Sequence, residues 1–307
     1  MLYGHAHAAP APAARLRAAI TTARGDFRDA RYERVPAVLP GIIATAQATS
    51  QDAGAGQRAE ASGLLADAYL LAADFAVKVN DDPLSWMTAD RALQAAQASG
   101  DPLLVADARR ALATAMRRAH HPGRAVDLLL RACRDVEPGG NAGPDQLATY
   151  GNLLTVAAYT AATAGNRSAA REYMAEAASA AARLGTATSS RQPAFGPAGL
   201  TLYQVSIAQV LGDNGTAIDH ARSIRPADIP TPERQGRYWV DVARAWHQWG
   251  KPESCYRALL AAERAAPAEV RYRPPVHRMA EDLLSRDARS SLPGLRAFAR
   301  RVGLPGQ

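Results

Sequence analysis

A short phrase recurs with variation along this chain of 307 residues, and it constrains the fold more than any other feature. In each copy a Gly ends one amphipathic segment, a polar residue begins the next, and a small residue follows five positions after the Gly. Such a repeat indicates stacked helical hairpins, because each unit buries its apolar face against its neighbours. The phrase begins at Gly25, Gly165, Gly212 and Gly250, and the small residue is placed at Ala30, Ala89, Ala125, Ala170, Ala217 and Cys255.

The sequence therefore predicts an all-α fold, a tetratricopeptide-like α-solenoid of about six helical hairpins. The small residue has a physical reason, since the second helix of each hairpin must cross close to the first. Helix starts are marked by a capping residue followed by Pro, as at Asp101-Pro102 and Thr231-Pro232. Residues 1–12 are expected to form a flexible tail, and residues 13–307 a single helical-repeat domain.

Composition narrows the class of protein without naming a function. Hydrophobic residues make up 48% of the chain, which is enough for a long core, and the formal net charge is +7. Lys78 and Lys251 are the only lysines, so the positive charge is carried by Arg. Two cysteines do not make a disulfide framework. No segment is apolar for long enough to span a bilayer and the N-terminus lacks a signal peptide, so we expect a cytoplasmic protein without a membrane partner.

No pattern in the sequence indicates catalysis. The nucleophile elbow, the P-loop, the zinc-protease motif and the dinucleotide fingerprint are all missing from it. His5 and His7 lie in the tail and His120-His121 in a turn, without carboxylates or thiols at metal-ligand spacing. We therefore expect no enzyme, no catalytic residue, no metal and no cofactor.

Polar and aromatic side chains on the first helices of hairpins are the candidate binding residues, because in such stacks those helices line the concave side. Asn there is able to bond a backbone amide in both directions. The helix starting at Pro232 adds charged groups at helical spacing, which either fix a peptide in the groove or form ordinary intrahelical pairs. The candidate ligand-binding residues are Asn152, Tyr159, Tyr203, Gln204, Arg237, Asp241 and Arg244.

The C-terminal half resembles a known family. Its motifs include Thr231-Pro-Glu-Arg, Phe195-Gly-Pro197 and the stretches 238–246, 258–267 and 269–274. They are similar to the C-terminal helical-repeat region of actinobacterial XRE-type helix-turn-helix transcriptional regulators. The resemblance covers nearly the whole chain and is densest from Phe195 to Leu304. It implies the sensory and oligomerisation part of a regulator.

Two positions of the family pattern differ here. Regulators of this kind carry a DNA-binding domain ahead of the repeats, and the residues before Pro12 leave no room for one, so the sequence is either a stand-alone homologue or a fragment. The family pattern also has Asn-Val and His after Phe-Gly-Pro, where this chain has Gly199-Leu200 and Tyr203.

The resemblance leads us to expect a ligand- or peptide-sensing, protein-interaction repeat domain. Its candidate partners are a peptide, a protein segment or a small molecule in the concave groove, a second copy of the chain as a homodimer, and a DNA-binding partner protein. Two alternatives stay open. One is a stand-alone interaction scaffold without ligand sensing, and the other is direct DNA binding through the basic C-terminus. Its arginines are Arg286, Arg289, Arg296, Arg300 and Arg301.

Overall fold

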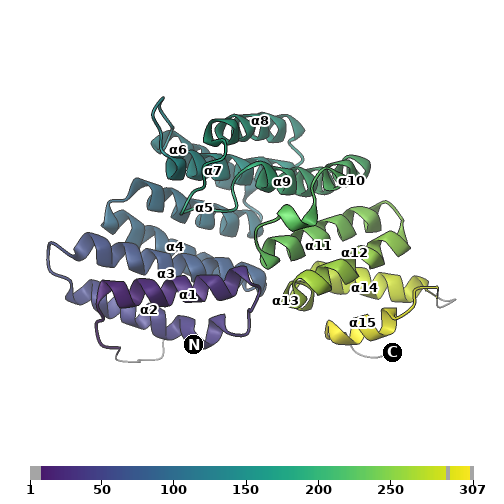
Figure 1. Cartoon of the computed structure of the whole chain (residues 1–307), viewed down its shortest axis with the longest axis horizontal. Helices are drawn as coiled ribbons and strands as arrows, with labels where there is room; N and C mark the ends of the chain where they lie inside the picture. The colour runs from purple at the N-terminus through teal and green to yellow at the C-terminus, as the bar shows by residue number, and fades with distance from the viewer. Residues whose placement is uncertain (1–7, 288–290, 305–307) are drawn as a thin grey trace.

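The computed structural model describes residues 8–287 and 291–304, and they form α-helices joined by short connections (Figure 1). The first two hairpins are α1 (Ala13–Arg28) with α2 (Val35–Asp52) and α3 (Arg58–Lys78) with α4 (Asp82–Ser99). The others are α5 (Pro102–Arg118) with α6 (Pro122–Asp135), α7 (Pro144–Thr163) with α8 (Arg167–Leu184), α9 (Pro197–Val210) with α10 (Asn214–Arg222), and α11 (Pro232–Gln248) with α12 (Pro252–Ala265). After them come α13 (Pro267–Arg271), α14 (Pro274–Arg286) and α15 (Leu295–Arg301), and the short 3-10 turn η1 (Pro226–Asp228) precedes α11.

The described residues contain no β-strand, and the predicted all-α solenoid of about six hairpins is confirmed. Within each hairpin the two helices pack against one another, and the first helices also contact each other in sequence, from α1 to α3 and on to α11. The first helices therefore form one continuous inner row. None of the described helices has the length and apolar character needed to cross a bilayer.

The turn inside each hairpin has one backbone design. The helix ends on a residue with positive φ, such as Gly165 at 77° or Gly212 at 82°, and the next N–H bonds to the carbonyl five residues back, as Asn166 does to Ala161. This is the Schellman arrangement, in which Gly avoids the steric cost of left-handed backbone. Asn80 and His120 take the same position without being Gly.

The predicted register of the repeat is wrong in the first two hairpins. Helix α1 continues through Gly25, and the left-handed residue is Ala30 itself, with φ of 55°, so the slot five positions later belongs to Val35. In the second hairpin the same count from Asn80 reaches Ser85 rather than Ala89, although both are buried. Asp26 is consequently inside a helix and not at its start. The remaining slots are confirmed as fully buried small residues at Ala125, Ala170, Ala217 and Cys255.

The chain of hairpins curls until its two ends meet. Figure 1 shows the end of α1 facing α13 across the middle of the molecule, and α1 also contacts α11. Tyr32, which follows α1, is 2% exposed and packs with Ala30 and Ala266 in a small apolar cluster. We call the two parts that meet here the N-terminal arm (α1–α6) and the C-terminal arm (α11–α15); helices α7–α10 connect them.

Candidate functional site

A cluster of tyrosine rings and guanidinium groups lies on the inner row. The rings of Tyr159 on α7 and Tyr203 on α9 meet edge to face, with centroids 6.5 Å apart. The guanidinium of Arg237 on α11 lies 5.4 Å from the Tyr203 ring and 5.9 Å from the Tyr159 ring, and that of Arg117 on α5 lies 4.8 Å from Tyr159. At these distances a cation is attracted to the face of a ring. Four consecutive hairpins thus contribute one residue each.

A small hollow adjoins this cluster. Its volume is about 10 Å³, which is room for roughly one water molecule. Its lining combines two phenols, a hydroxyl, two guanidinium groups and a carboxylate with one aliphatic side chain. Directed polar groups of this kind also line small-ligand sites, which are larger, at about 300–1,000 Å³. The lining residues are Leu202, Tyr203, Ser206, Arg234, Arg237, Tyr238 and Asp241.

Positive charge dominates the surroundings of Tyr203. Burial raises the pKa of its phenol, but Arg237, Arg234 and Arg110 outweigh that effect and hold the pKa below its ordinary value of 10.0. Burial by itself disfavours the phenolate relative to water, so the lowered pKa reflects an excess of nearby cations. The site therefore presents a positive electrostatic potential to whatever enters it.

Asp241 is the buried carboxylate of the hollow, with 6% of its surface exposed. The hydroxyl of Ser206 donates a hydrogen bond to it at 2.5 Å, and guanidinium groups of Arg237 and Arg244 lie 3.8 and 3.6 Å away. The pairs expected from helical spacing are therefore present. Asp241 therefore pairs with two arginines along α11, and its hydrogen bond from Ser206 links α11 to α9 of the preceding hairpin.

A second polar cluster is formed by the connection between α8 and α9, residues 185–196, which lies along the inner side of α5 and α7. We call this connection the strap. Its backbone and side chains bind Asp145 at the start of α7: the hydroxyls of Ser189 and Ser190 donate to its two carboxylate oxygens, at 2.7 and 2.9 Å, and the Arg191 N–H donates at 3.2 Å. These bonds lower the pKa of Asp145, Ser189 having the largest effect.

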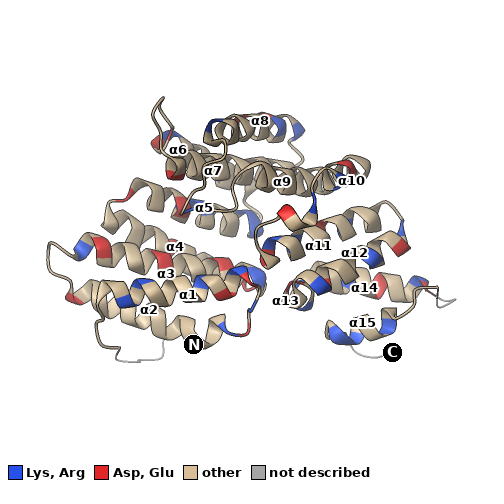
Figure 2. Ribbon diagram, in the orientation of Figure 1, with Lys and Arg blue, Asp and Glu red and all other residues tan. Residues whose placement is uncertain are grey.

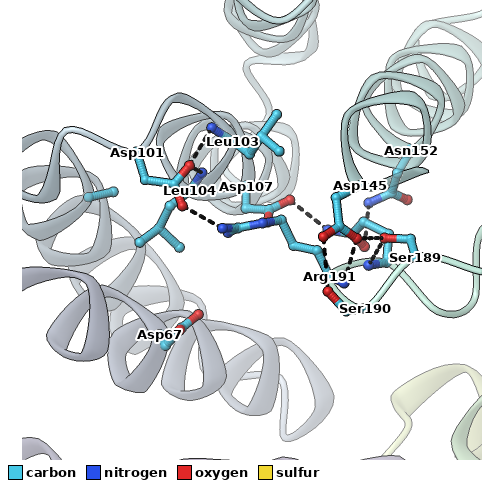
Figure 3. Close-up of polar contacts among 12 residues, drawn as sticks. Asp67, Asp101, Leu103, Leu104, Asp107, Asp145, Asn152, Ser189, Ser190 and Arg191 are labelled. Carbon is cyan, nitrogen blue, oxygen red and sulfur yellow. Dashed lines mark hydrogen bonds and ion pairs between the residues drawn. The ribbon is translucent and has the colours of Figure 1, made fainter. Parts of the chain in front are cut away.

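Side chains of the strap also bind the N-terminal arm (Figure 3). A guanidinium nitrogen of Arg191 donates to Asp101 at 2.5 Å, and another lies 3.6 Å from Asp107. Gln192 donates to Asp107 at 2.6 Å and accepts from Asn152 at 3.1 Å. The strap is thus held on both sides by hydrogen bonds.

A third cluster joins the two arms. The ammonium of Lys78, at the end of α3, lies 2.8 Å from a carboxylate oxygen of Glu269 on α13 and also pairs with Glu233 on α11. Glu269 further accepts from the Tyr32 hydroxyl and pairs with Arg273. Lys78, Glu233 and Glu269 are all less than 10% exposed. We call these five residues the junction.

Ionisation of the junction is set by its cations. Burial alone raises the pKa of Glu233, but Lys78 and Arg234 lower it to about 2. Burial likewise opposes ionisation of Glu269, whose pKa is nevertheless lowered by Arg273 and Lys78. Both carboxylates are therefore charged at neutral pH, and each depends on the lysine between them.

The structure brings together four of the seven residues predicted for ligand binding. Tyr159, Tyr203, Arg237 and Asp241 share the cluster and its hollow. Arg244 contacts the far side of Asp241, and Asn152 belongs to the strap contacts instead. Gln204 is half-buried on α9 and is not part of the lining.

Sequence reasoning missed the junction and the remaining arginines of the inner row. Arg110 and Arg117 belong to no motif, and Arg234 belongs to one that indicated a family rather than a binding site, so only the projected face of each helix would have grouped them. One signal for the junction was available in the composition: Lys78 is one of only two lysines in a chain that otherwise uses Arg. The other lysine, Lys251, is exposed.

Both cysteines are buried, Cys133 at 5% and Cys255 at 0% exposure, and burial raises each thiol pKa to about 12. Across residues 8–287 and 291–304 no group of His, Cys, Asp and Glu has the arrangement of a metal site. His5 and His7 lie outside the described residues.

The basic C-terminus is partly neutralised by its own surroundings (Figure 2). Arg301 on α15 donates two hydrogen bonds of 2.7 Å to the carboxylate of Glu263 on α12. Arg286 pairs with Asp282 at 2.9 Å, while Arg289 lies outside the described residues.

The fold and the lining together define an all-α helical-repeat protein with an arginine- and tyrosine-rich inner face. No protein-family model and no curated protein matches the chain. Among solved structures, BtubC (BKLC) from P. vanneervenii is similar, with 18% sequence identity and a TM-score of 0.46; the match covers 79% of this chain and 94% of that chain.

Proposed function

We propose that this protein is a ligand-sensing helical-repeat domain whose inner face binds a small molecule or a peptide segment without catalysing a reaction. The observation that carries the proposal is the meeting of Tyr159, Tyr203 and Arg237 beside a hollow. Aromatic faces and guanidinium donors are common anchors of ligand sites, since they combine contact area with directed hydrogen bonds.

The junction supplies the element that a ligand would act upon. Helix α11 carries Glu233, which binds Lys78 of the other arm, and also Arg234 and Arg237, which line the hollow. A ligand that contacts either arginine therefore shifts the same helix that closes the arms. It changes the population of closed molecules only by the difference between its affinities for the closed and open states.

The output of the sensor follows from the family resemblance. We propose that a DNA-binding partner protein binds the closed and the open states of the solenoid with different affinities. A second copy of the chain is a further candidate partner. Direct DNA binding receives less support, because Arg301 and Arg286 of the basic C-terminus are already paired with carboxylates.

Native mass spectrometry of protein purified gently from its own cells tests ligand binding. We expect an additional bound mass in the wild type, its loss in Tyr203→Ala, and its retention in Tyr272→Ala. Tyr272 is a matched control because it is 38% exposed. A wild-type protein without bound mass would favour the scaffold alternative, and a mass retained in Tyr203→Ala would place the ligand elsewhere.

A further inference from the structure

The carboxylates around the inner cluster do not balance its cations. Each carboxylate that pairs with an inner arginine also pairs with a second cation, so one negative charge compensates two positive charges only in part. The nitrogen–oxygen separations in these shared pairs are mostly between 3.3 and 3.8 Å, longer than those of close charge-assisted hydrogen bonds. The shared carboxylates are Asp74, between Arg24 and Arg110; Asp241, between Arg237 and Arg244; and Glu233, between Lys78 and Arg234.

Two arginines of the inner row are not paired with a carboxylate. Neither Arg117 on α5 nor Arg28 on α1 forms an ion pair with any residue that the structure describes. Arg117 rests on the Tyr159 ring, and its Nε is buried without a hydrogen-bond partner. Burial is the main cause that lowers the pKa of Arg117, and the positive charge of Arg237 lowers it further.

Arg28, at the end of α1 in the same N-terminal arm as Arg117, is half-buried. Burial lowers the pKa of Arg28, and the neighbouring charges of Arg24 and Arg234 add to the effect, while the carboxylate of Asp74 opposes it without forming an ion pair. A guanidinium group stays protonated at every physiological pH, so neither arginine relieves the repulsion by losing its proton. Burying a charge without a partner is costly, and a bound anion would remove that cost.

We propose that the inner cluster binds a ligand bearing a phosphate-type group with two or more negative charges, held between Arg117, Arg237 and Arg234. This inference rests on the proposed function of the inner face and names the chemical class of its ligand. The guanidinium groups come from two helices, α5 and α11, of opposite arms. A tetrahedral group offers oxygens in several directions, whereas one guanidinium fork already fills a planar carboxylate.

The tyrosines favour a particular kind of ligand around that group. Tyr159 and Tyr203 present ring surface beside the arginines, and Leu202 and Tyr238 line the same hollow. A phosphate monoester or diphosphate with an apolar or flat organic part would use both surfaces. Free inorganic pyrophosphate has the charge without the organic part, which makes it a clean probe of the arginines alone.

Calorimetric titration of the full chain with pyrophosphate tests the proposal, with succinate as a dicarboxylate comparison at equal ionic strength. We expect binding of pyrophosphate, weakening by about tenfold or more in Arg117→Gln because a hydrogen bond to a charged group is lost, and no change in Arg131→Gln. Arg131 is a matched control, since it is an exposed arginine on the outer helix α6.

The stability of the ligand-free protein gives a second readout. Because Arg117 is repelled by its neighbours, we expect Arg117→Gln to melt at or above the wild-type temperature in anion-poor buffer, while it loses the rise in Tm that pyrophosphate gives the wild type. Equal binding of succinate and pyrophosphate would overturn the phosphate class. Pyrophosphate binding that Arg117→Gln leaves unchanged, or no binding at all, would overturn the site. A bound mass without phosphorus in native mass spectrometry would refute this inference and leave the proposed function standing.

Discussion

The ammonium group of Lys78 lies 2.8 Å from a carboxylate oxygen of Glu269, although the two residues belong to opposite arms of the solenoid. The same ammonium pairs with Glu233, so one buried cation holds two buried carboxylates. The arms can meet here because the positive charge of Lys78 compensates the negative charges that Glu233 and Glu269 bury. Because α11 carries Glu233 beside the residues lining the hollow, closure of the arms and the shape of the inner face depend on one another.

Replacing Lys78 by Met should destabilise the protein strongly. The substitution keeps an apolar stem of similar length but leaves Glu233 and Glu269 facing each other in a buried place, and breaking a buried pair in this way costs about 3–5 kcal/mol. Urea denaturation measures the loss. Lys251→Met is the control, because Lys251 is exposed and its replacement should stay within about 0.5 kcal/mol of the wild type. Equal effects at both lysines would contradict this role for the junction.

Acid should weaken the junction in a defined range. The pKa of Glu233 is about 2 in the folded protein, below its ordinary value of 4.5, so the unfolded state takes up a proton first as pH falls. The stability that the charged group contributes is complete above pH 4.5 and is lost between that value and about pH 2. In Glu233→Gln this part of the acid loss should be missing. Parallel pH profiles of the unfolding free energy for both proteins provide the test.

Replacing Gly151 by Ala should displace the strap. A Cβ placed on Gly151 in α7 would lie 2.0 Å from the Phe195 ring, and no side-chain pair tolerates that distance. We expect a loss of about 1–3 kcal/mol from overpacking, recovered in part by adding Phe195→Leu. Gly41→Ala in α2, where no atom lies within 4 Å, should be neutral or stabilising. If Gly151→Ala behaved like Gly41→Ala, Phe195 would not sit where the structure places it.

Replacing Arg191 by Ala should loosen the strap without unfolding the solenoid. Arg191 supplies the contacts to Asp101 and Asp107, and the backbone N–H groups of Arg191 and Gln192 are held by Asp145 and Ser189. Hydrogen–deuterium exchange should become faster in residues 186–196 and remain slow in α7. Arg171→Ala on α8, at an exposed position, serves as the control. Unchanged exchange in the strap would show that its backbone contacts suffice without the Arg191 side chain.

Local signals in the sequence predicted most of the fold. The caps at Asp101 and Thr231 are confirmed by their hydrogen bonds to Leu103 and Arg234, since capping is decided within a few residues. The register failed at Ala30 for a physical reason: a left-handed residue ends α1 without being Gly, and Gly25 fits inside the helix. Residue type alone does not distinguish these two cases.

Local sequence signals do not predict which residues far apart in the chain come into contact. Tyr32 and Glu269 meet only because six hairpins accumulate enough curvature to bring the arms together, and no pattern near either residue records it. The predicted binding residues Tyr159, Tyr203 and Arg237 meet because each lies on the inner side of a first helix, which periodicity does reveal. Arg117 completes their cluster and was not predicted, because a single arginine on a helix is ordinarily solvated.

The most direct test of the closed solenoid is a distance measurement between spin labels at Glu33 and Arg271. Both positions are exposed and flank the residues of the junction, one on each arm, while the native cysteines are buried. Pulsed electron paramagnetic resonance should give one short, narrow distance distribution in the wild type, and a longer and broader one in Lys78→Met. A long or broad distribution in the wild type itself would contradict closure of the arms and the inner face built upon it.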